Sequence, residues 1–188
     1  MMEIPGNVYI QKQLTELRVQ RWLDDELFSP LWWILIAAMI ALVVLWWVLI
    51  RREKILEVSL FAFLAAVIYM GICEYGEELT LWDFPTDIIA YFPTLSAINF
   101  VLLGLGFSLL YQYFEQTMSF AWAAAVFSAA VCFGADPLLS AAGLYRLVRW
   151  HYFESLPIYF ASAVLVRTAV VRIVETAGVR KQVLNQGW

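Results

Sequence analysis

Residues 31–50 read LWWILIAAMIALVVLWWVLI and carry no charged side chain. Because an α-helix rises about 1.5 Å per residue, this stretch spans about 30 Å, the thickness of the hydrocarbon core of a bilayer. Tryptophan pairs at 32–33 and 46–47 stand near its two ends, and indole rings prefer the membrane interfaces. The stretch therefore predicts a transmembrane helix.

The composition extends this prediction to the whole chain. Of its 188 residues, 63% are hydrophobic and 15% are charged, whereas soluble domains are about 45–50% apolar and about 25% charged. A soluble fold of this size could not bury so much apolar surface, but a bilayer solvates it. We therefore expect an all-α fold, a polytopic transmembrane helical bundle of about five spans. The formal net charge of -4 argues against nucleic-acid binding, which needs a concentrated basic face.

Four further apolar runs complete the predicted bundle. They cover about residues 55–73, 86–113, 118–135 and 156–174. Pro93 interrupts the third span, whose first part is expected to be either a separate short segment or a kinked part of the same helix. The stretch 137–154, before the last span, is expected to lie in the interface or to form a re-entrant turn.

The predicted transmembrane domain covers residues 30–176 and is flanked by two tails. In the N-terminal tail, residues 1–29, apolar side chains occur among charged ones at roughly helical spacing. This spacing favours an amphipathic helix that lies on the membrane, and a short solvated helix before the first span is the equal alternative. The C-terminal tail covers residues 177–188. No cleavable signal peptide is predicted, because the first apolar run has the length of a span and follows a polar tail.

Basic residues predict the orientation of the bundle through the positive-inside rule. Arg51, Arg52 and Lys54 follow the first span, whereas residues 74–87 after the second span hold five acids and no basic residue. More basic residues stand near the end of the last span. These facts place the N-terminus outside and the C-terminus in the cytoplasm, although basic residues in the N-terminal tail and before the last span run against this orientation.

Short motifs along the chain carry a resemblance to a known family. They are LWDFP at 81–85, YQYF at 111–114, ADPL at 135–138, GLY at 143–145, WHY at 150–152 and SLPIYF at 155–160. In this order and spacing they resemble a family of small multi-pass membrane proteins from spore-forming Firmicutes, known only by a locus-tag name and without an assigned activity. The resemblance covers residues 22–175. This chain has Asp136 where members more often have Glu, and Arg51 where their basic loop opens with Asp. The resemblance implies the predicted topology and a bacterial cell membrane, and it supplies no catalytic residues.

Acidic residues dominate the first group of candidate site residues. Glu74, Glu77 and Glu78 share one face of a helix through their three- and four-residue spacing. Asp136 should lie on the same side of the membrane. One hypothesis is an acidic mouth that concentrates cations or protons, and the other is a solvated acidic loop. The candidate set for an ion, proton or polar-network site is Glu74, Glu77, Glu78, Asp136, Arg146 and Arg149.

Asp136 is the sharpest single candidate, because it follows a long apolar run and precedes Pro137. Proline removes a backbone donor and frees a carbonyl, so a carboxylate at this position can bind a cation. It can also pair with a nearby cationic side chain, which is the favoured interpretation, or simply mark the end of the helix. The cationic side chains considered for this pair are Arg146, Arg149 and His151.

Basic residues form the second group, as candidate contacts for lipid headgroups. Arg167 lies about twelve residues into the last span, where a cation is costly unless it pairs or reaches the interface. We expect its long side chain to reach the headgroups, and a buried functional pair is the alternative. The candidate basic rim for anionic lipid is Arg51, Arg52, Lys54, Arg167 and Arg172.

Two further patterns concern packing. Ala121, Ala125 and Ala129 repeat every four residues in the fourth span, a spacing that lets helices approach closely. We expect this helix to be central to the bundle or to be an oligomer contact. Tyr159, like other aromatic residues near the span ends, is expected to be an interface anchor rather than part of a cofactor cage.

The sequence predicts no catalytic machinery. No nucleotide loop, nucleophile elbow, HExxH or CxxC motif occurs, and the chain has a single histidine. We therefore expect no enzyme activity, no metal site and no cofactor. The favoured hypothesis is a structural or accessory component of a homo-oligomer or a membrane complex, with the lipid bilayer and other membrane proteins as partners. The alternative is a small cation or proton channel, or a transporter subunit, that uses the acidic residues. An intramembrane enzyme acting on lipid ranks last.

Overall fold

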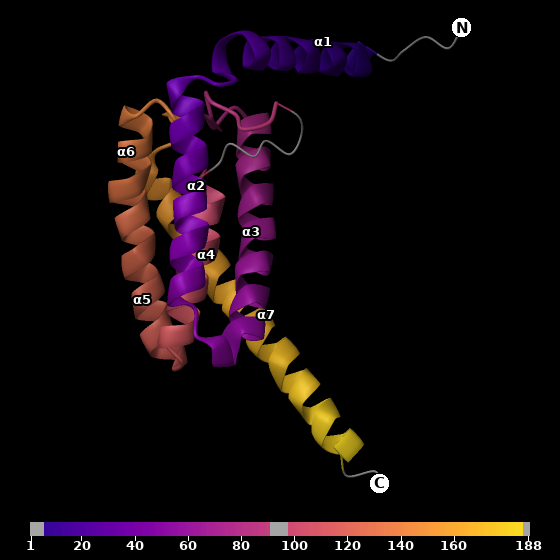
Figure 1. Ribbon diagram of the computed structural model, residues 1–188, viewed down its shortest axis with the longest axis vertical. Helices are drawn as coiled ribbons and strands as arrows, with labels where there is room; N and C mark the ends of the chain where they lie inside the picture. The colour runs from indigo at the N-terminus through magenta and orange to yellow at the C-terminus, as the bar shows by residue number, and fades with distance from the viewer. Residues whose placement is uncertain (1–5, 91–97, 186–188) are drawn as a thin grey trace, which may run out of the picture.

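The chain folds into a bundle of helices, and the computed structural model describes the backbone of residues 6–90 and 98–185 (Figure 1). Side chains are described for residues 6–90 and 101–178. In chain order the elements are α1 (Gly6–Arg21), the π-helical turn η1 (Trp22–Glu26), α2 (Pro30–Leu49), the 3-10 turn η2 (Arg52–Lys54), α3 (Ile55–Glu78), β1 (Trp82–Asp83), α4 (Ile98–Tyr113), α5 (Thr117–Ala130), the π-helical turn η3 (Val131–Ala135), α6 (Asp136–Ala141), β2 (Arg146–Leu147) and α7 (Tyr152–Asn185). The all-α prediction is confirmed.

Four helical segments of the described chain are long and apolar enough to cross a membrane. They are Pro30–Leu49, Arg52–Glu78, Thr117–Ala141 and Tyr152–Gly178. The third predicted span is represented by α4, whose apolar part, Val101–Tyr113, is shorter than a full crossing. Pro93, where we expected a break or a kink, lies outside the described residues. The length and composition of these helices make the chain a membrane protein.

Helix ends follow the sequence where local signals are strong. Ser29 caps α2, because its side chain accepts a hydrogen bond of 3.2 Å from the Trp32 amide, and a proline occupies the first turn. The helix α3 continues past its predicted end at residue 73 to Glu78, so the three glutamates belong to its last turns. In the same way α7 continues to Asn185, and most of the predicted C-terminal tail extends this helix.

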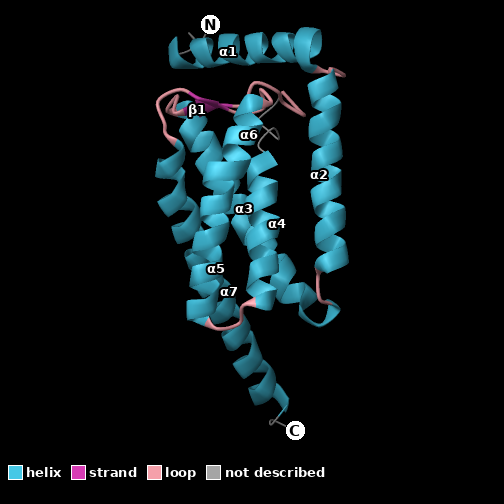
Figure 2. Ribbon diagram, turned by 90° about the vertical axis from the view of Figure 1, so that its left-hand side faces the viewer, coloured by secondary structure: helices cyan, strands magenta, loops and turns pink. Residues whose placement is uncertain are grey.

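The helix α4 lies in the middle of the bundle and packs against α2, α3, α5 and α7. Its closest neighbour is α3, since a Cβ on Gly104 would lie only 3.4 Å from the carbonyl oxygen of Ala62. The helix α2 packs mainly on α4 and stands at the edge of the bundle (Figure 2). The helix α5 packs on α7 and α4 and buries Phe120, Ala124 and Ser128. The alanine repeat at 121–129 stays partly exposed within one chain, so its role as an oligomer contact stays a prediction.

The centre of the bundle is filled by apolar and aromatic side chains, which we call the apolar middle. Its members are Phe61, Ala65, Leu103, Phe107, Phe120, Ala124, Ala163 and Val166, all essentially inaccessible. The rings of Phe61 and Phe120 meet edge to face at 6.1 Å between centroids, and Phe107 meets Phe127 in the same way at 5.0 Å. Such contacts add to the packing that holds membrane helices together, because lipid supplies no hydrophobic force between them.

The two ends of the bundle differ in construction. At one end, β1 pairs antiparallel with β2, so that Trp82 faces Leu147 and Asp83 faces Arg146. The paired strands resemble a hairpin, although α4, α5 and α6 separate them in the chain, and we call this the hairpin end. The predicted interfacial or re-entrant stretch 137–154 supplies the last helical turns before β2, β2 itself and the start of α7, and it crosses this end of the bundle (Figure 2). The opposite end carries η2 and the turn between α4 and α5, and we call it the Lys54 end.

The helix α1 lies across the hairpin end, nearly at right angles to the bundle (Figure 1). Hydrogen bonds from the C-terminal end of α1 and from η1 join it to the loop after β1. Arg21 donates to the carbonyl oxygen of Pro85 at 3.2 Å, and the Trp22 indole donates to that of Asp87 at 2.9 Å. The Glu26 carboxylate accepts from the amide of Asp87 at 2.9 Å. The predicted helix is therefore present, and its position on a membrane surface stays a prediction.

Candidate functional site

Asp136 lies inside a continuous helix and not at the end of one. The helix α5 runs through the π-helical turn η3 into α6, and the amide of Asp136 donates to the carbonyl oxygen of Val131, five residues earlier. Proline at position 137 lacks an amide hydrogen, and a single wide turn before it accommodates the missing bond. The alternative that Asp136-Pro137 ends the helix is wrong, because α6 continues to Ala141.

The carboxylate of Asp136 is fully buried, with 0% of the residue exposed. Its Oδ2 atom accepts a hydrogen bond of 3.1 Å from the hydroxyl of Tyr159 on α7. The hydroxyl of Tyr69 on α3 in turn donates to the backbone carbonyl of Tyr159 at 3.0 Å. Tyr159 is buried, so its expected role as an interface anchor is wrong. A carboxylate held in this way fastens α6 to α7, and α3 joins the same contact.

A small cavity opens beside this group, between α3, α4 and α7. Its volume of about 20 Å³ is enough for a single water molecule. Polar atoms on its wall come from Tyr69, Cys73, Tyr145 and Ser155. Burial, followed by the negative charge of Asp136, raises the pKa of Tyr145 well above its ordinary value, so this phenol remains a hydrogen-bond donor. The surroundings of Asp136 therefore offer neutral hydroxyl groups to the carboxylate.

Trp82 separates this cavity from the polar surface of the hairpin end. Its side chain lines both the small cavity and a larger pocket of about 480 Å³ beneath α1. The indole ring rests directly on α3, since a Cβ on Gly76 would lie 1.9 Å from its Cζ2 atom. It also meets Trp150 edge to face, at 5.4 Å between ring centroids. Among the described residues, the buried indole nitrogen has no hydrogen-bond partner.

The larger pocket, which we call the hairpin pocket, carries charges of both signs. Its charged lining consists of Arg18, Arg21, Glu26, Glu77, Asp83, Asp87 and Arg146. Arg21 and Glu26 form an ion pair at 3.2 Å. The lining of this pocket comes from α1, α3 and the two strands, and the hydrogen bonds of Arg21, Trp22 and Glu26 to the loop after β1 hold the N-terminal helix over the hairpin end.

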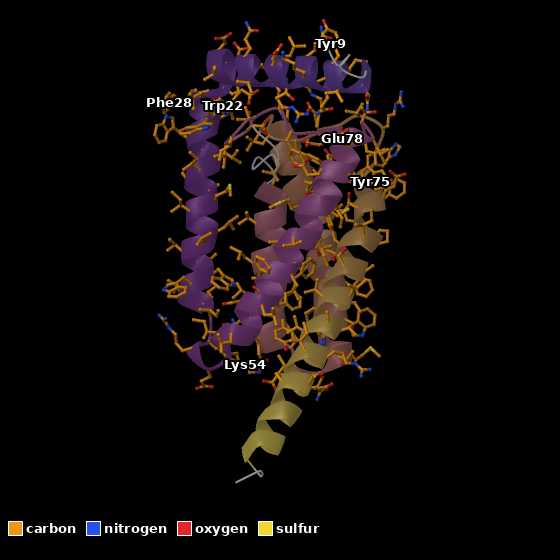
Figure 3. All side chains as sticks on the ribbon, turned by 90° about the vertical axis from the view of Figure 1, so that its right-hand side faces the viewer. Tyr9, Trp22, Phe28, Lys54, Tyr75 and Glu78 are labelled. Carbon is orange, nitrogen blue, oxygen red and sulfur yellow. The ribbon has the colours of Figure 1, made fainter. Side chains whose placement is uncertain are left out.

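The six residues of the predicted polar network do not meet in one place. Glu77 and Arg146 line the hairpin pocket, and Asp136 is buried within the helices below it. Glu78 is exposed at the end of α3, at the opposite end of that helix from Lys54 (Figure 3). Glu74 is partly buried on the same helix, and Arg149 is exposed. Their placement on one side of a membrane stays a prediction, and their convergence on a single cavity is not observed.

Arg167 is a buried cation, and it lies toward the Lys54 end. Only 7% of the residue is exposed. One terminal nitrogen, Nη2, donates to the backbone carbonyl of Glu115 in the turn before α5, and the guanidinium lies 4.9 Å from the ring centroid of Phe120. The other terminal nitrogen, Nη1, is enclosed and has no hydrogen-bond partner among the described residues.

The other predicted basic residues surround the same end. Arg51 lies over the ring of Tyr113, and Arg52 lies over that of Trp47, at 4.8 and 5.0 Å from the ring centroids. Lys54 forms an ion pair with Glu115. The hydrogen bond and the charge of Lys54 lower the pKa of the Glu115 carboxyl. Arg172 is exposed on α7. Their contact with lipid headgroups stays a prediction.

Gln112 is a structural residue that the sequence analysis missed. Its amide is fully buried, donates to the carbonyl oxygen of Leu49 at 3.0 Å and accepts from the amide of Arg51 at 2.9 Å. These bonds replace the backbone partners that α2 loses at its C-terminal end. A buried amide in an apolar helix was the available signal, because such a group needs partners in a neighbouring element.

No family model, no curated protein and no solved structure matches this chain. Among the described residues, no group of histidine, cysteine, aspartate and glutamate side chains could hold a metal ion. The candidate sites are therefore defined by geometry alone, around the buried charges of Asp136 and Arg167 near opposite ends of one bundle.

Proposed function

We propose that the chain is a non-conducting accessory protein of a bacterial cell membrane. The observation that carries this proposal is the apolar middle, which lies between the polar residues of the hairpin end and those of the Lys54 end. A path for ions needs polar atoms along its length, or a wide constriction that water can enter. Phe61, Phe107 and Phe120 instead fill the centre, and their rings are in contact with neighbouring aromatic rings.

The hairpin end is proposed to face outward and the Lys54 end to face the cytoplasm. Arg51, Arg52, Lys54 and Arg172 all lie toward the Lys54 end, which supports this orientation through the positive-inside rule. Glu77, Glu78 and Asp83 lie at the hairpin end.

Cysteine labelling tests the orientation in whole cells. In a background with Cys73 and Cys132 replaced by alanine, Glu78→Cys should react with a membrane-impermeant maleimide, whereas Lys54→Cys should react only after the membrane is permeabilised. Both positions are at the surface of the bundle, so each serves as the control for the other. The opposite pattern would reverse the orientation.

An ion-flux measurement tests the absence of conduction. Purified protein in proteoliposomes should show no proton or potassium flux above that of protein-free vesicles, across a range of membrane potentials. An ionophore added at the end of each trace shows that the vesicles are sealed. Flux that depends on the protein would remove the proposal.

A second function, as a proton-binding subunit, is favoured by the surroundings of Asp136. A carboxylate within a membrane helix is costly and is often functional, and the hydrogen-bond partner of this one, Tyr159, lines a cavity large enough for water. A proton arriving through the hairpin pocket would have to pass Trp82, which borders both spaces. This second function would become the better conclusion if flux were observed and vanished in Asp136→Asn.

Infrared spectroscopy tests proton binding directly. A change of pH should produce a carbonyl band of a protonated carboxyl group in the wild type, and that band should be absent in Asp136→Asn. Glu78→Gln removes an exposed carboxyl and should keep the band. A spectrum that is identical in wild type and Asp136→Asn would exclude proton exchange at this residue.

A further inference from the structure

A groove of about 400 Å³ runs between α5 and α7 toward the Lys54 end, and we call it the α5–α7 groove. Its polar lining comes from Thr117, Arg167, Thr168, Arg172 and Glu175. Phe120, Ala121, Val164 and Val171 supply its apolar wall. A polar end next to an apolar wall is the arrangement that a molecule with a charged head and a hydrocarbon tail requires.

Arg167 is the first observation that indicates an anionic ligand. A guanidinium group stays charged at every physiological pH and carries five N–H donors. Here one nitrogen uses a neutral backbone carbonyl, and the enclosed Nη1 atom has no partner among the described residues. No carboxylate of those residues forms an ion pair with the side chain. An unsatisfied buried donor of this kind is destabilising, and more so when it is charged. The group therefore lacks an anion.

The N-terminus of α5 is the second observation. Thr117 is the first residue of this helix, which is 14 residues long, and the side chain of the N-cap residue Gln116 forms no capping hydrogen bond. The first amides of a helix carry a partial positive charge and form a ready site for phosphate. Because Thr117 and Arg167 line the same groove, the helix end and the guanidinium can act on one phosphate group.

The flanks of the groove indicate where this phosphate comes from. Met118, Trp122 and Leu165 are large apolar side chains on α5 and α7, and they are 71%, 69% and 62% exposed. In a membrane this face contacts lipid, so the groove opens toward lipid near the end of the bundle. Glu175 disfavours a second negative charge near it, but it stands eight residues beyond Arg167, about 12 Å along the helix.

We propose that the α5–α7 groove binds the phosphate of a membrane phospholipid. The guanidinium of Arg167 and the N-terminus of α5 hold the phosphate, after a rotation of the Arg167 side chain that brings Nη1 into the groove. Arg172 adds positive charge at the rim, and an acyl chain lies along Val164 and Val171, which are partly exposed. The site rests on membrane insertion alone, so it stands or falls independently of conduction and of proton binding at Asp136.

Lipid retention measured by native mass spectrometry tests the proposal. Full-length protein is purified in detergent, delipidated and titrated with phosphatidylglycerol, phosphatidylethanolamine, diacylglycerol or inorganic phosphate. We expect binding of the two phospholipids, no binding of diacylglycerol and no competition by inorganic phosphate at equal concentration. Retention of inorganic phosphate, without retention of either phospholipid, would show a site for a free anion and overturn the lipid assignment.

Variants identify the residues that hold the lipid. Arg167→Gln should weaken phospholipid binding about ten- to hundredfold, because it removes hydrogen bonds between charged groups, and Arg167→Lys should recover part of the loss. Arg52→Gln is the matched control, since it removes an exposed cation near the same end that lies over Trp47. Equal binding by wild type and Arg167→Gln would overturn the proposal.

A second variant keeps the test valid if Arg167→Gln does not fold. Thr117→Asp places a carboxylate in the first turn of α5, where it stabilises the helix but repels a phosphate. It should therefore fold at least as well as wild type and lose phospholipid binding. Undiminished binding in Thr117→Asp would contradict the assigned position of the phosphate.

Discussion

Asp136 and Arg167, two buried charges of this bundle, are satisfied in different ways. Asp136 is 0% exposed and accepts a hydrogen bond from the hydroxyl of Tyr159 on another helix. Arg167 is 7% exposed, but it has only a backbone carbonyl, an aromatic ring and one nitrogen without a partner among the described residues. A short carboxylate has to find its partners within the protein, whereas a long cationic side chain near a membrane surface can also use lipid phosphates. Asp136 therefore has its partner within the protein, whereas the contacts of Arg167 are left for the lipid around the protein to complete.

Replacing Asp136 should have the largest effect on stability. Asp136→Leu leaves the buried hydroxyl of Tyr159 without its acceptor and places a bulkier apolar group at a packed position, so we expect a loss of about 2–3 kcal/mol. The measurement is the SDS concentration that unfolds the delipidated protein in mixed micelles, followed by circular dichroism. Asp136→Asn keeps an acceptor oxygen and should lose much less. Equal losses in the two variants would show that the hydrogen bond is not what stabilises this contact.

Gly76→Ala should have the next largest effect, because it disturbs the tryptophan above the Asp136 site. The new Cβ would lie 1.9 Å from Trp82, whose ring is packed and must shift, and overpacking costs about 1–3 kcal/mol. Gly71→Ala, on the same helix, meets no atom within 4 Å and is the control. It should be neutral or stabilising. Equal unfolding midpoints for both variants would show that Trp82 moves without cost.

Replacing Arg167 should change the free energy of unfolding by a smaller amount, and in the opposite direction from replacing Asp136. Arg167→Leu removes the enclosed nitrogen that has no partner among the described residues. The Glu115 carbonyl loses its bond to Arg167, but it lies in a turn at the surface, where water can replace that bond. In delipidated detergent we expect no loss and a gain of at most about 1 kcal/mol. The same unfolding experiment measures it. A loss as large as that of Asp136→Leu would show that the two charges are equally satisfied within the protein.

The ion pair at the Lys54 end should have the smallest effect, and it makes stability depend on pH. Lys54 lowers the pKa of the Glu115 carboxyl in the folded protein below its usual 4.5. A lowered folded pKa contributes stability above the unfolded pKa, and this contribution is lost as the pH falls through the folded pKa. Lys54→Met should therefore raise the Glu115 pKa toward its usual value, with the charge of Arg51 still lowering it, as measured by NMR titration of a labelled glutamate. Because the pair is exposed, stability at neutral pH should hardly change.

Much of the fold followed from the sequence, and the exceptions are polar residues within apolar helices. The first two spans begin within a residue of their predicted starts, since hydropathy and flanking charges act locally. The helix through Asp136 was predicted to end there, because proline usually breaks a helix. It continues because a π-helical turn accommodates the proline. The role of Tyr159 could not be predicted, since an aromatic residue near a span end is ordinarily an anchor and its partner lies 23 residues away in sequence.

The sequence by itself determined that this chain lies in a membrane as a helical bundle, because length and hydropathy add up along the chain and require no knowledge of neighbours. The tertiary structure alone decided which buried polar atoms are satisfied. Asp136 meets Tyr159, and Arg167 meets a carbonyl 52 residues away while one of its nitrogens stays without a partner among the described residues. Hydrogen bonds depend on distances of a few tenths of an ångström between separate helices, and no local pattern of residues specifies those distances.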